Sequence, residues 1–413
     1  MSDRTTILLI PEPPDLCAQQ EVSTATLEFE RSQNICCQVE IHVEEGLSSW
    51  KLYSRDQRGH RKQTGGDEFY IRYEEYRESN YEEKEEELQK PALQAVAIIT
   101  DHDDGSYSLD FATTPMYPNL PATDESIGKR LLSVHFEYSN GIGSLPPPTK
   151  EKWQNGGYTH KLHIYPFCPK RPRIRTFCAP SCRTGDIDFG NFDKVLAFGD
   201  STMDQFVRQR PNKKGKYYFQ PNIRVGEKVR VGLNHETLET LLELLHADFG
   251  DELSYQDSRI ALIVGSCLWD ILNSQDTLQG KGYENHIQAC RDYIRLIRER
   301  YPNATVFWKS PMAVHIHWVD LARLVEHDKE TASLFGVDRV RYMSASRSRY
   351  LHERQVRLMK EELDVPVLDL YEATYLSADQ LYPSDGRHYR PHLNRLMLSW
   401  FYPPHEDSQT RPP

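Results

Sequence analysis

The hydrophobic pattern of the chain changes near residue 190, and this change limits the folds that the chain can adopt. Before it, apolar and polar residues alternate in short runs, as in Cys-Gln-Val-Glu-Ile-His-Val at 37–43. After it, continuous apolar runs such as 195–198 and 260–264 alternate with stretches of helical spacing such as 283–300. A period of two is typical of strands with one buried face, whereas continuous apolar runs are typical of strands buried on both faces. The sequence therefore predicts two domains of different fold class.

Residues 20–165 are predicted to form an all-β domain. Its short alternating runs, separated by turn-forming Gly, Asp, Asn and Pro residues, lie at 24–29, 37–43, 68–73, 95–100, 106–112, 131–138 and 158–165. Many short strands with turns between them favour an immunoglobulin-like sandwich of two antiparallel sheets. No set of residues in this domain indicates catalysis.

Residues 191–402 are predicted to form a three-layer α/β domain. Its buried strand candidates are 195–198, 260–264, 305–308 and 365–370. Because helical segments lie between them, the pattern indicates a doubly wound, flavodoxin-like parallel sheet. Residues 166–190, rich in Pro, Arg and Cys, are interpreted as the connector between the domains, and the polar, proline-rich end, 403–413, is predicted to be disordered.

Composition and charge argue against several classes of function. The formal net charge of −11 leaves no basic footprint for nucleic acid. No run approaches the roughly 18 apolar residues of a membrane-spanning helix. The apolar run at 7–10 is shorter than the core of a secretory signal, which needs about 7–15 residues. The chain as it stands shows no export signal and does not identify the compartment.

A cluster of cysteines raises the question of a metal. Cys168, Cys178 and Cys182 lie near His160 and His163 in the sequence, but their spacing matches no tight pattern of paired zinc ligands. The alternatives are a disulfide, reduced structural thiols or a zinc site, and only the last would need a metal. No metal and no other cofactor is predicted.

The most informative short segment follows the first buried run of the second domain. The run at 194–198 stops at Gly199-Asp200-Ser201, and helical spacing begins directly afterwards. A serine between a buried strand and a helix is well placed as a nucleophile, because its own N–H and the positive end of the helix can stabilise an oxyanion. Sites in doubly wound sheets form beyond the carboxyl ends of the strands. Ser201 is therefore predicted to be the nucleophile of an acyl-transfer enzyme.

A serine hydroxyl needs a base and a group that orients the base. Asp385-Gly386-Arg387-His388 lies just before an amphipathic segment at 391–401, and a spacing of three lets one turn present Asp385 and His388 in the same direction. Histidine suits the role of base because its pKa lies near neutrality. Arg387, between them, either contacts an anionic group of the substrate or is a loop residue that faces solvent.

These two blocks resemble the signature of the SGNH (GDSL-type) hydrolases. The segment Ser-Cys-Leu-Trp-Asp at 266–270 also resembles a block of the PC-esterase branch within that class. The resemblance covers about 191–402. It implies that Ser201 is the nucleophile, His388 the base and Asp385 the carboxylate that orients it.

The first domain carries a second resemblance. Asp-Gly-Ser-Tyr at 104–107 and Gly-Gly-Asp-Glu-Phe at 65–69 are similar to segments of filamin-type immunoglobulin-like repeats. This resemblance implies that the first domain is a spacer or a docking surface for a protein partner. A filamin-type domain followed by a PC-esterase domain is the layout of the neurexophilin/PC-esterase family. The resemblance implies O-acylated carbohydrates or glycoconjugates as substrates and makes the secretory pathway a candidate compartment.

The resemblance also implies an oxyanion hole with donors from three places. The backbone N–H of Ser201 would be the first donor. The second block of the family contributes a glycine, for which Gly232 is preferred here over Gly226. In the third block the chain departs from the family, because Gly265 stands where an asparagine amide is usual.

The third donor leaves two hypotheses open. A backbone N–H, Ser266 or Asn234 are the candidate substitutes for the missing amide. With a substitute, the chain is a serine-dependent O-acyl esterase or acyltransferase, most simply for O-acetyl groups on glycans, with water or a hydroxyl as the acceptor. Without one, it is a catalytically weakened SGNH fold that binds a glycan or a protein.

Overall fold

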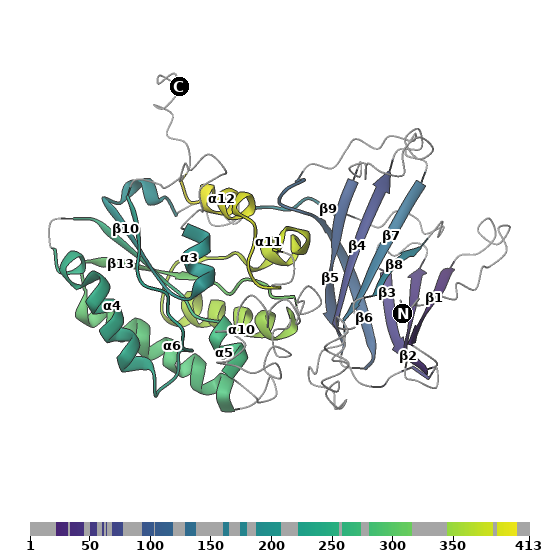
Figure 1. Cartoon of the computed structure of the whole chain (residues 1–413), viewed down its shortest axis with the longest axis horizontal. Helices are drawn as coiled ribbons and strands as arrows, with labels where there is room; N and C mark the ends of the chain where they lie inside the picture. The colour runs from purple at the N-terminus through teal and green to yellow at the C-terminus, as the bar shows by residue number, and fades with distance from the viewer. Residues whose placement is uncertain are drawn as a thin grey trace, which may run out of the picture. The chain divides into compact units, whose positions relative to one another are not determined.

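The structure is a computed structural model of the whole chain (Figure 1). The residues that it describes are 22–31, 34–44, 50–55, 60–61, 63, 68–76, 93–102, 104–118, 129–137, 160–164, 174–179, 187–207, 222–255, 258–273, 281–315, 345–382 and 386–402. The chain divides into two compact units, Met1–Phe177 and Cys178–Pro413. The division falls inside the predicted connector, and the predicted disordered end, 403–413, lies outside the described residues.

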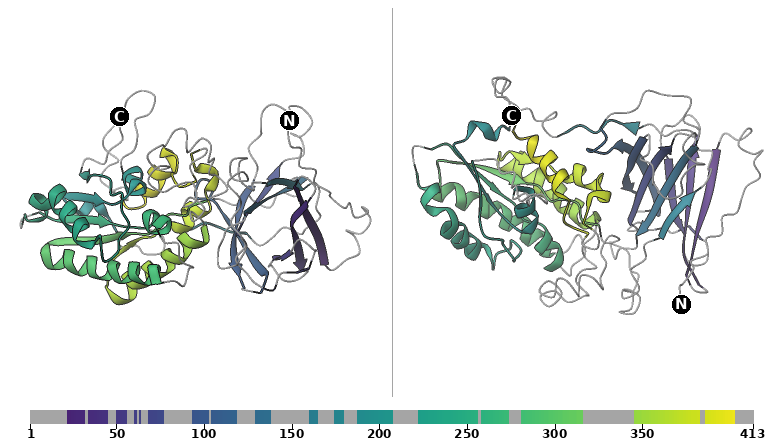
Figure 2. Two further views of the ribbon diagram at one scale, coloured as in Figure 1. Left: turned by 60° about the horizontal axis from the view of Figure 1, so that its bottom comes forward. Right: turned by 45° about the horizontal axis from the view of Figure 1, so that its top comes forward.

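The first unit contains one sheet of nine strands. The strands are β1 (Val22–Arg31), β2 (Asn34–Glu44), β3 (Trp50–Arg55), β4 (Glu68–Tyr76), β5 (Leu93–Asp101), β6 (Ser106–Thr113), β7 (Lys129–Glu137), β8 (His160–Ile164) and β9 (Ile174–Arg175). They pair in the order β1-β2-β3-β6-β5-β4-β7-β8, antiparallel throughout, and β9 pairs with β6 in parallel. Figure 2 shows that this sheet is strongly curved.

The structure bears out the antiparallel β character of this unit but not the immunoglobulin-like sandwich. A sandwich has two packed sheets, whereas here one path of hydrogen-bonded neighbours leads from β1 to β8. The Asp-Gly-Ser-Tyr segment forms the tight turn between β5 and β6. Gly105 takes a left-handed φ of 81°, and the Asp104 carboxylate accepts the Ser106 N–H at 2.8 Å. The similarity to filamin-type repeats stays a prediction.

The second unit is built on a parallel sheet of five strands in the order β11-β10-β12-β13-β14. The strands are β10 (Lys194–Phe198), β11 (Ile223–Val225), β12 (Ile260–Val264), β13 (Ala304–Lys309) and β14 (Val367–Leu368). The chain runs from β10 outward to β11 and then crosses to β12. The direction of winding therefore reverses between β10 and β12, which is the switch point where doubly wound sheets form their sites.

Helices connect these strands. They are α3 (Ser201–Val207), α4 (Leu238–Leu253), α5 (Leu268–Asn273), α6 (Lys281–Arg300), α10 (Ala345–Arg357), α11 (Tyr371–Tyr375) and α12 (Pro391–Ser399). Proline opens α12 at its first position, where its fixed φ and missing N–H cost nothing. The predicted α/β class with a parallel sheet is confirmed. Within the described residues, no helix has the length and apolar character that crossing a membrane requires.

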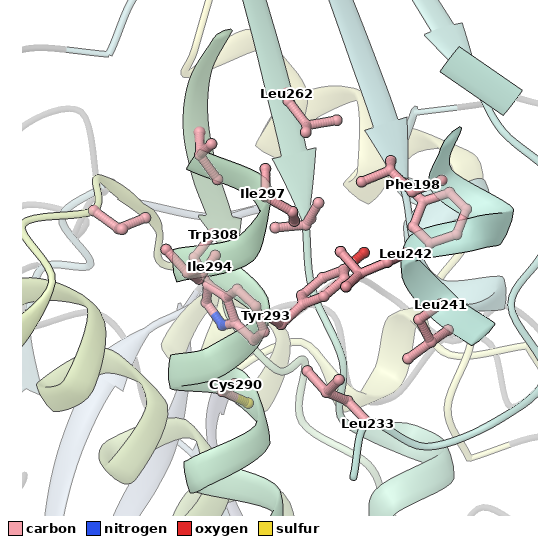
Figure 3. Packing of buried hydrophobic residues seen from close by; sticks show 14 of the residues in the cluster. Phe198, Leu233, Leu241, Leu242, Leu262, Cys290, Tyr293, Ile294, Ile297 and Trp308 are labelled. Carbon is pink, nitrogen blue, oxygen red and sulfur yellow. The ribbon is translucent and has the colours of Figure 1, made fainter. Parts of the chain in front are cut away.

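The helices α4 and α6 cover one face of the parallel sheet. Alternate strand residues, among them Phe198, Leu262 and Trp308, pack there against Leu242 and Ile294 (Figure 3). On the other face α3 packs against α12 (Figure 1). Because both faces are covered, strand residues such as Leu196 and Ala197 are buried regardless of the direction in which they point. The rigid sheet therefore holds the carboxyl ends of β10, β12 and β13 side by side.

Candidate active site

The Gly-Asp-Ser segment forms a capped turn at the carboxyl end of β10. The Asp200 carboxylate accepts the Thr202 N–H at 2.8 Å and the Thr202 hydroxyl at 2.6 Å. Its backbone carbonyl accepts the N–H groups of Met203 and Asp204 at 3.0 and 3.1 Å. Asp200 is therefore the N-cap of α3, and Ser201 is the first residue of that helix. The predicted position of Ser201, between strand and helix, is confirmed.

His388 reaches this turn from the far end of the chain. Its Nε2 lies 2.8 Å from Ser201 Oγ, across 187 positions of sequence. His388 is 9% exposed. In the tautomer that carries its proton on Nδ1, Nε2 can accept the hydrogen bond of the serine hydroxyl. The structure thus brings together two of the residues singled out in the sequence.

The segment before α12 holds His388 in place. Gly386 takes a left-handed φ of 68°, and its carbonyl accepts the His315 N–H at 2.7 Å. The carbonyl of His388 accepts the Tyr382 N–H at 2.9 Å. Asp385 lies outside the described residues, so its role stays a prediction. Arg387 is only 6% exposed, which removes the interpretation that it faces solvent.

Gly265 comes directly after β12, and no side chain fits there. A Cβ at this position would lie 2.7 Å from the backbone carbonyl oxygen of Lys309 and 3.3 Å from its Cβ. A distance of 2.7 Å is below that of any real contact of this kind, and backbone atoms cannot turn aside. The close approach of β13 therefore accounts for the glycine where the resemblance implies asparagine.

Sequence analysis did not single out Lys309, the last residue of β13, or its partner Thr202. Lys309 is 5% exposed, and its Nζ donates to Thr202 Oγ1 at 3.2 Å and to the Ser310 carbonyl at 3.4 Å. Burial lowers the pKa of Lys309, and the charge of Asp200 opposes that shift. Thr202 links Lys309 to Asp200, because its hydroxyl accepts from Lys309 Nζ and donates to the Asp200 carboxylate. A lysine at the end of an apolar run was visible in the sequence, but its burial was not.

Gly232 and Ser266 both lie against Asp270. The Asp270 carboxylate accepts the Leu233 N–H at 2.7 Å and the Ser266 hydroxyl at 2.5 Å. A Cβ on Gly232 would lie 2.6 Å from Asp270 Oδ1, so the carboxylate packs against the Gly232 backbone. Because the Ser266 hydroxyl donates to Asp270, it is committed to that bond. The oxygen of Asn234, the other candidate side chain, accepts the Glu236 and Thr237 N–H groups before α4.

The cysteine cluster is described only in part. Cys178 is half-buried, while Cys168 and Cys182 lie outside the described residues. Among the residues that the structure does describe, no group of three or more His, Cys, Asp or Glu side chains could hold a metal ion.

No family model and no curated protein matches the chain. Solved structures resemble about half of it at low scores. A protein described as a GDSL-like lipase from Parabacteroides merdae is 16% identical, with a TM-score of 0.32 over 51% of this chain and 94% of its own. An acetyl xylan esterase is 14% identical, with a TM-score of 0.33 over 50% of this chain and 96% of its own. A catalytic mutant of an acetylxylan esterase from Geobacillus stearothermophilus is 17% identical, with a TM-score of 0.31 over 51% and 92%. Similarity at this level assigns neither a family nor an activity to the chain.

Proposed function

We propose that the second unit is a serine-dependent esterase or acyltransferase. One observation carries the proposal: Ser201 Oγ and His388 Nε2, which are far apart in the sequence, lie 2.8 Å apart at the carboxyl edge of the parallel sheet. A nucleophile and a base within hydrogen-bond reach are the minimum for acyl transfer through serine. The base is only slightly exposed, which suits a proton transfer that water must not intercept.

In the proposed mechanism, Ser201 Oγ attacks the carbonyl carbon of the ester while His388 Nε2 takes the hydroxyl proton. The tetrahedral intermediate collapses, the C–O bond of the ester breaks, and His388 returns the proton to the leaving alkoxide. The acyl group is then bound to Ser201 Oγ. A water or a second hydroxyl, deprotonated by His388, attacks the carbonyl carbon of this acyl-enzyme. The bond from that carbon to Ser201 Oγ then breaks, and His388 returns the proton to Ser201 Oγ. Asp385 would hold His388 in the required tautomer.

The oxyanion would be stabilised mainly by backbone N–H groups. Ser201 is the first residue of α3, and the first N–H groups of a helix have no acceptor within it. Asp200 takes the Thr202 N–H, which leaves that of Ser201 as the donor of this turn. Gly232 would add a second N–H. Gly265 cannot carry a side-chain amide, so the third donor of the resemblance is replaced or lost.

The substrate class follows from the motif resemblance given above. We propose O-acyl groups, above all O-acetyl groups, on glycans or glycoconjugates. The geometry around Ser201 serves hydrolysis and transfer equally, because the two differ only in the group that attacks the acyl-enzyme.

The proposal is tested with Ser201→Ala and His388→Ala in the full chain. We expect each to lower turnover of an aryl acetate and of an acetylated sugar panel by about 10⁴–10⁶. Ser254→Ala, which removes a hydroxyl bonded to the Gly250 carbonyl at the end of α4, is the matched control and should keep full activity. Undiminished turnover in Ser201→Ala or His388→Ala contradicts the proposal.

Gly265 favours a second candidate function, a binding module on a catalytically weakened fold. An oxyanion hole that lacks one donor loses about 10²–10³ in rate. Covalent labelling separates the two candidates. An organophosphonate that modifies Ser201 in the folded protein supports the enzyme, whereas no labelling together with saturable glycan binding by Ser201→Ala supports the binding module.

A further inference from the structure

A network of buried polar side chains bonds the backbone of Leu233, the residue after Gly232. The proposed mechanism does not use this network. Its members come from four elements: Asp270 in α5, His286 in α6, Trp308 in β13 and Gln355 in α10. They are 7%, 2%, 0% and 0% exposed. Polar side chains so deeply buried cost free energy unless they are hydrogen-bonded, and a fully bonded network fixes its surroundings in one arrangement. The question is which part of the molecule this network holds.

The network holds the backbone of Leu233 from both sides. Asp270 Oδ1 accepts the Leu233 N–H at 2.7 Å, and His286 Nδ1 donates to the Leu233 carbonyl at 2.8 Å. His286 Nδ1 also lies 3.0 Å from Asp270 Oδ1, so the two side chains brace each other. A backbone segment held by both its N–H and its C=O cannot rotate its peptide planes.

The peptide that joins Gly232 to Leu233 is therefore fixed in orientation. Its N–H is bonded to Asp270, and its carbonyl, that of Gly232, accepts the Thr237 hydroxyl at 2.6 Å. Gly232 also has to be a glycine here, because the Asp270 carboxylate occupies the space of its side chain. The network thus fixes the peptide that follows Gly232, the residue to which the proposed mechanism gives the second oxyanion donor. The Gly232 N–H itself belongs to the preceding peptide, so the network acts on it through the Cα of Gly232.

The direction of every hydrogen bond in the network follows from one residue. An indole N–H can only donate, so the atom of Gln355 that lies 2.9 Å from Trp308 Nε1 is its oxygen. The amide nitrogen of Gln355 then donates to His286 Nε2 at 2.8 Å and to the Ser266 carbonyl at 2.9 Å. Since Nε2 accepts, the proton of His286 lies on Nδ1, where it serves Leu233 and Asp270. Gln355 also joins Ser266 to the same network.

We propose that Asp270, His286 and Gln355 are positioning residues of the oxyanion side: through Leu233 and Ser266 they fix the peptide after Gly232 and the backbone after β12, and so limit where Gly232 can direct its N–H. This inference rests on the proposed esterase or acyltransferase function. None of the three side chains touches the reacting atoms. Their effect is to make a backbone donor rigid before the reaction begins, which is the condition for strong stabilisation of an oxyanion.

The test compares Asp270→Ala with Asp270→Asn in the full chain, using the aryl acetate as substrate. We expect Asp270→Ala to lower kcat by about 10²–10³, the effect of losing one oxyanion donor, with KM little changed. Asp270→Asn should stay within about tenfold of the wild type, because its oxygen still accepts from Leu233 and its NH₂ can donate to Ser266 Oγ. Equal losses in both variants, or kcat within about threefold in a folded Asp270→Ala, overturn the proposal.

A second variant keeps the test decisive if Asp270→Ala does not fold. Gln355→Glu preserves shape but removes the donor to Ser266 and requires a proton on His286 Nε2. We expect kcat to fall about tenfold with KM unchanged, and nitrogen NMR of the His286 ring to show the added proton. An unchanged ring spectrum or an unchanged kcat contradicts the assignment of the network.

A readout that does not depend on activity separates this inference from the proposed function. Amide exchange of Leu233 should be slow in the wild type and fast in Asp270→Ala, while the amides of β12 stay protected. Asp369→Ala is the matched control, because it breaks another Asp–His pair, with His352 at 2.9 Å, and should change neither kcat nor Leu233 exchange. A wild type without turnover overturns the proposed function and the positioning role with it. Fast exchange of the Leu233 amide in an active wild type overturns only the proposal that Asp270 and His286 hold the Leu233 backbone.

Discussion

The two sides of the candidate site are held in different ways. On the base side, one hydrogen bond of 2.8 Å joins the side chains of Ser201 and His388. On the proposed oxyanion side, buried side chains bond the backbone of Leu233, which follows Gly232, and both the hydroxyl and the carbonyl of Ser266. The difference follows from what each side presents. A side chain brings its own reactive atom, whereas a backbone N–H can be aimed only by fixing the peptide around it.

The largest expected effect belongs to the base side. Asp385→Asn should lower kcat by about 10⁴, because a neutral amide in place of the carboxylate favours the wrong tautomer of His388. Exchange of the Leu233 amide should not change, because Asp270 and His286, which hold Leu233, do not belong to the segment around Asp385. Steady-state kinetics and amide exchange on the same protein measure both. Unaltered kcat would remove Asp385 from the proposed triad, and faster Leu233 exchange would show that the two sides are coupled.

A smaller effect is expected where β12 and β13 approach each other. Gly265→Ala places a methyl group 2.7 Å from the Lys309 carbonyl oxygen, so the strand ends must separate. Overpacking of this kind costs about 1–3 kcal/mol of unfolding free energy. Because the shift occurs between the two sides, kcat should fall as well. Urea unfolding and kinetics give the two numbers; Gly265→Ala with wild-type stability would contradict the close approach of the strands.

The smallest effect is a change in how stability depends on pH. Burial lowers the pKa of Lys309, although Asp200 opposes it, whereas an unfolded lysine titrates near 10.4. Between the lowered pKa and about 10.4 the unfolded chain binds more protons, so the contribution of Lys309 to stability rises with pH and then levels off. Lys309→Met removes this contribution.

The comparison of wild type and Lys309→Met by urea unfolding across alkaline pH isolates this group. The stability difference, wild type minus variant, should increase with pH up to about 10.4. Lys194→Met, at an exposed position at the start of β10, is the control and should leave the pH profile of the wild type unchanged. A flat difference between wild type and Lys309→Met would show that Lys309 has the same proton affinity folded and unfolded.

Local pattern was enough for much of the fold and for one side of the site. The apolar run before Gly199-Asp200-Ser201 became β10, and the helical stripe after residue 283 lies in α6. The pattern of the first unit predicted strands, but the pairing of those strands could not be read from it. A period of two reveals which residues face the same way, yet β3 pairs with β6 and β4 with β7, and no local pattern encodes such partners.

The oxyanion side was the least predictable part, for a reason that Gly265 illustrates. In the sequence, Gly265 stands where the resemblance implies an asparagine amide. In the structure, the missing side chain of Gly265 allows the close approach of Lys309 at the end of β13. Asp270, His286 and Gln355 are scattered over some 85 positions, and each alone could be an ordinary surface residue. Their burial and their contacts with one another become visible only when α5, α6 and α10 are packed together.

The sequence by itself determined the class of the second unit and the position of Ser201 between a strand and a helix, and it gave the pairing of this serine with a late histidine as a hypothesis. The first two depend on residues close together in the chain, where periodicity acts, and the hypothesis joined two short motifs that are each local. Only the tertiary structure showed that His388 lies within hydrogen-bond reach of Ser201 and that Lys309 leaves no room for a side chain at Gly265. It also showed that Asp270 and His286 bond the N–H and the carbonyl of Leu233. Each of these depends on atoms brought together by strand order and helix packing, and burial then gives their hydrogen bonds the strength to hold one geometry.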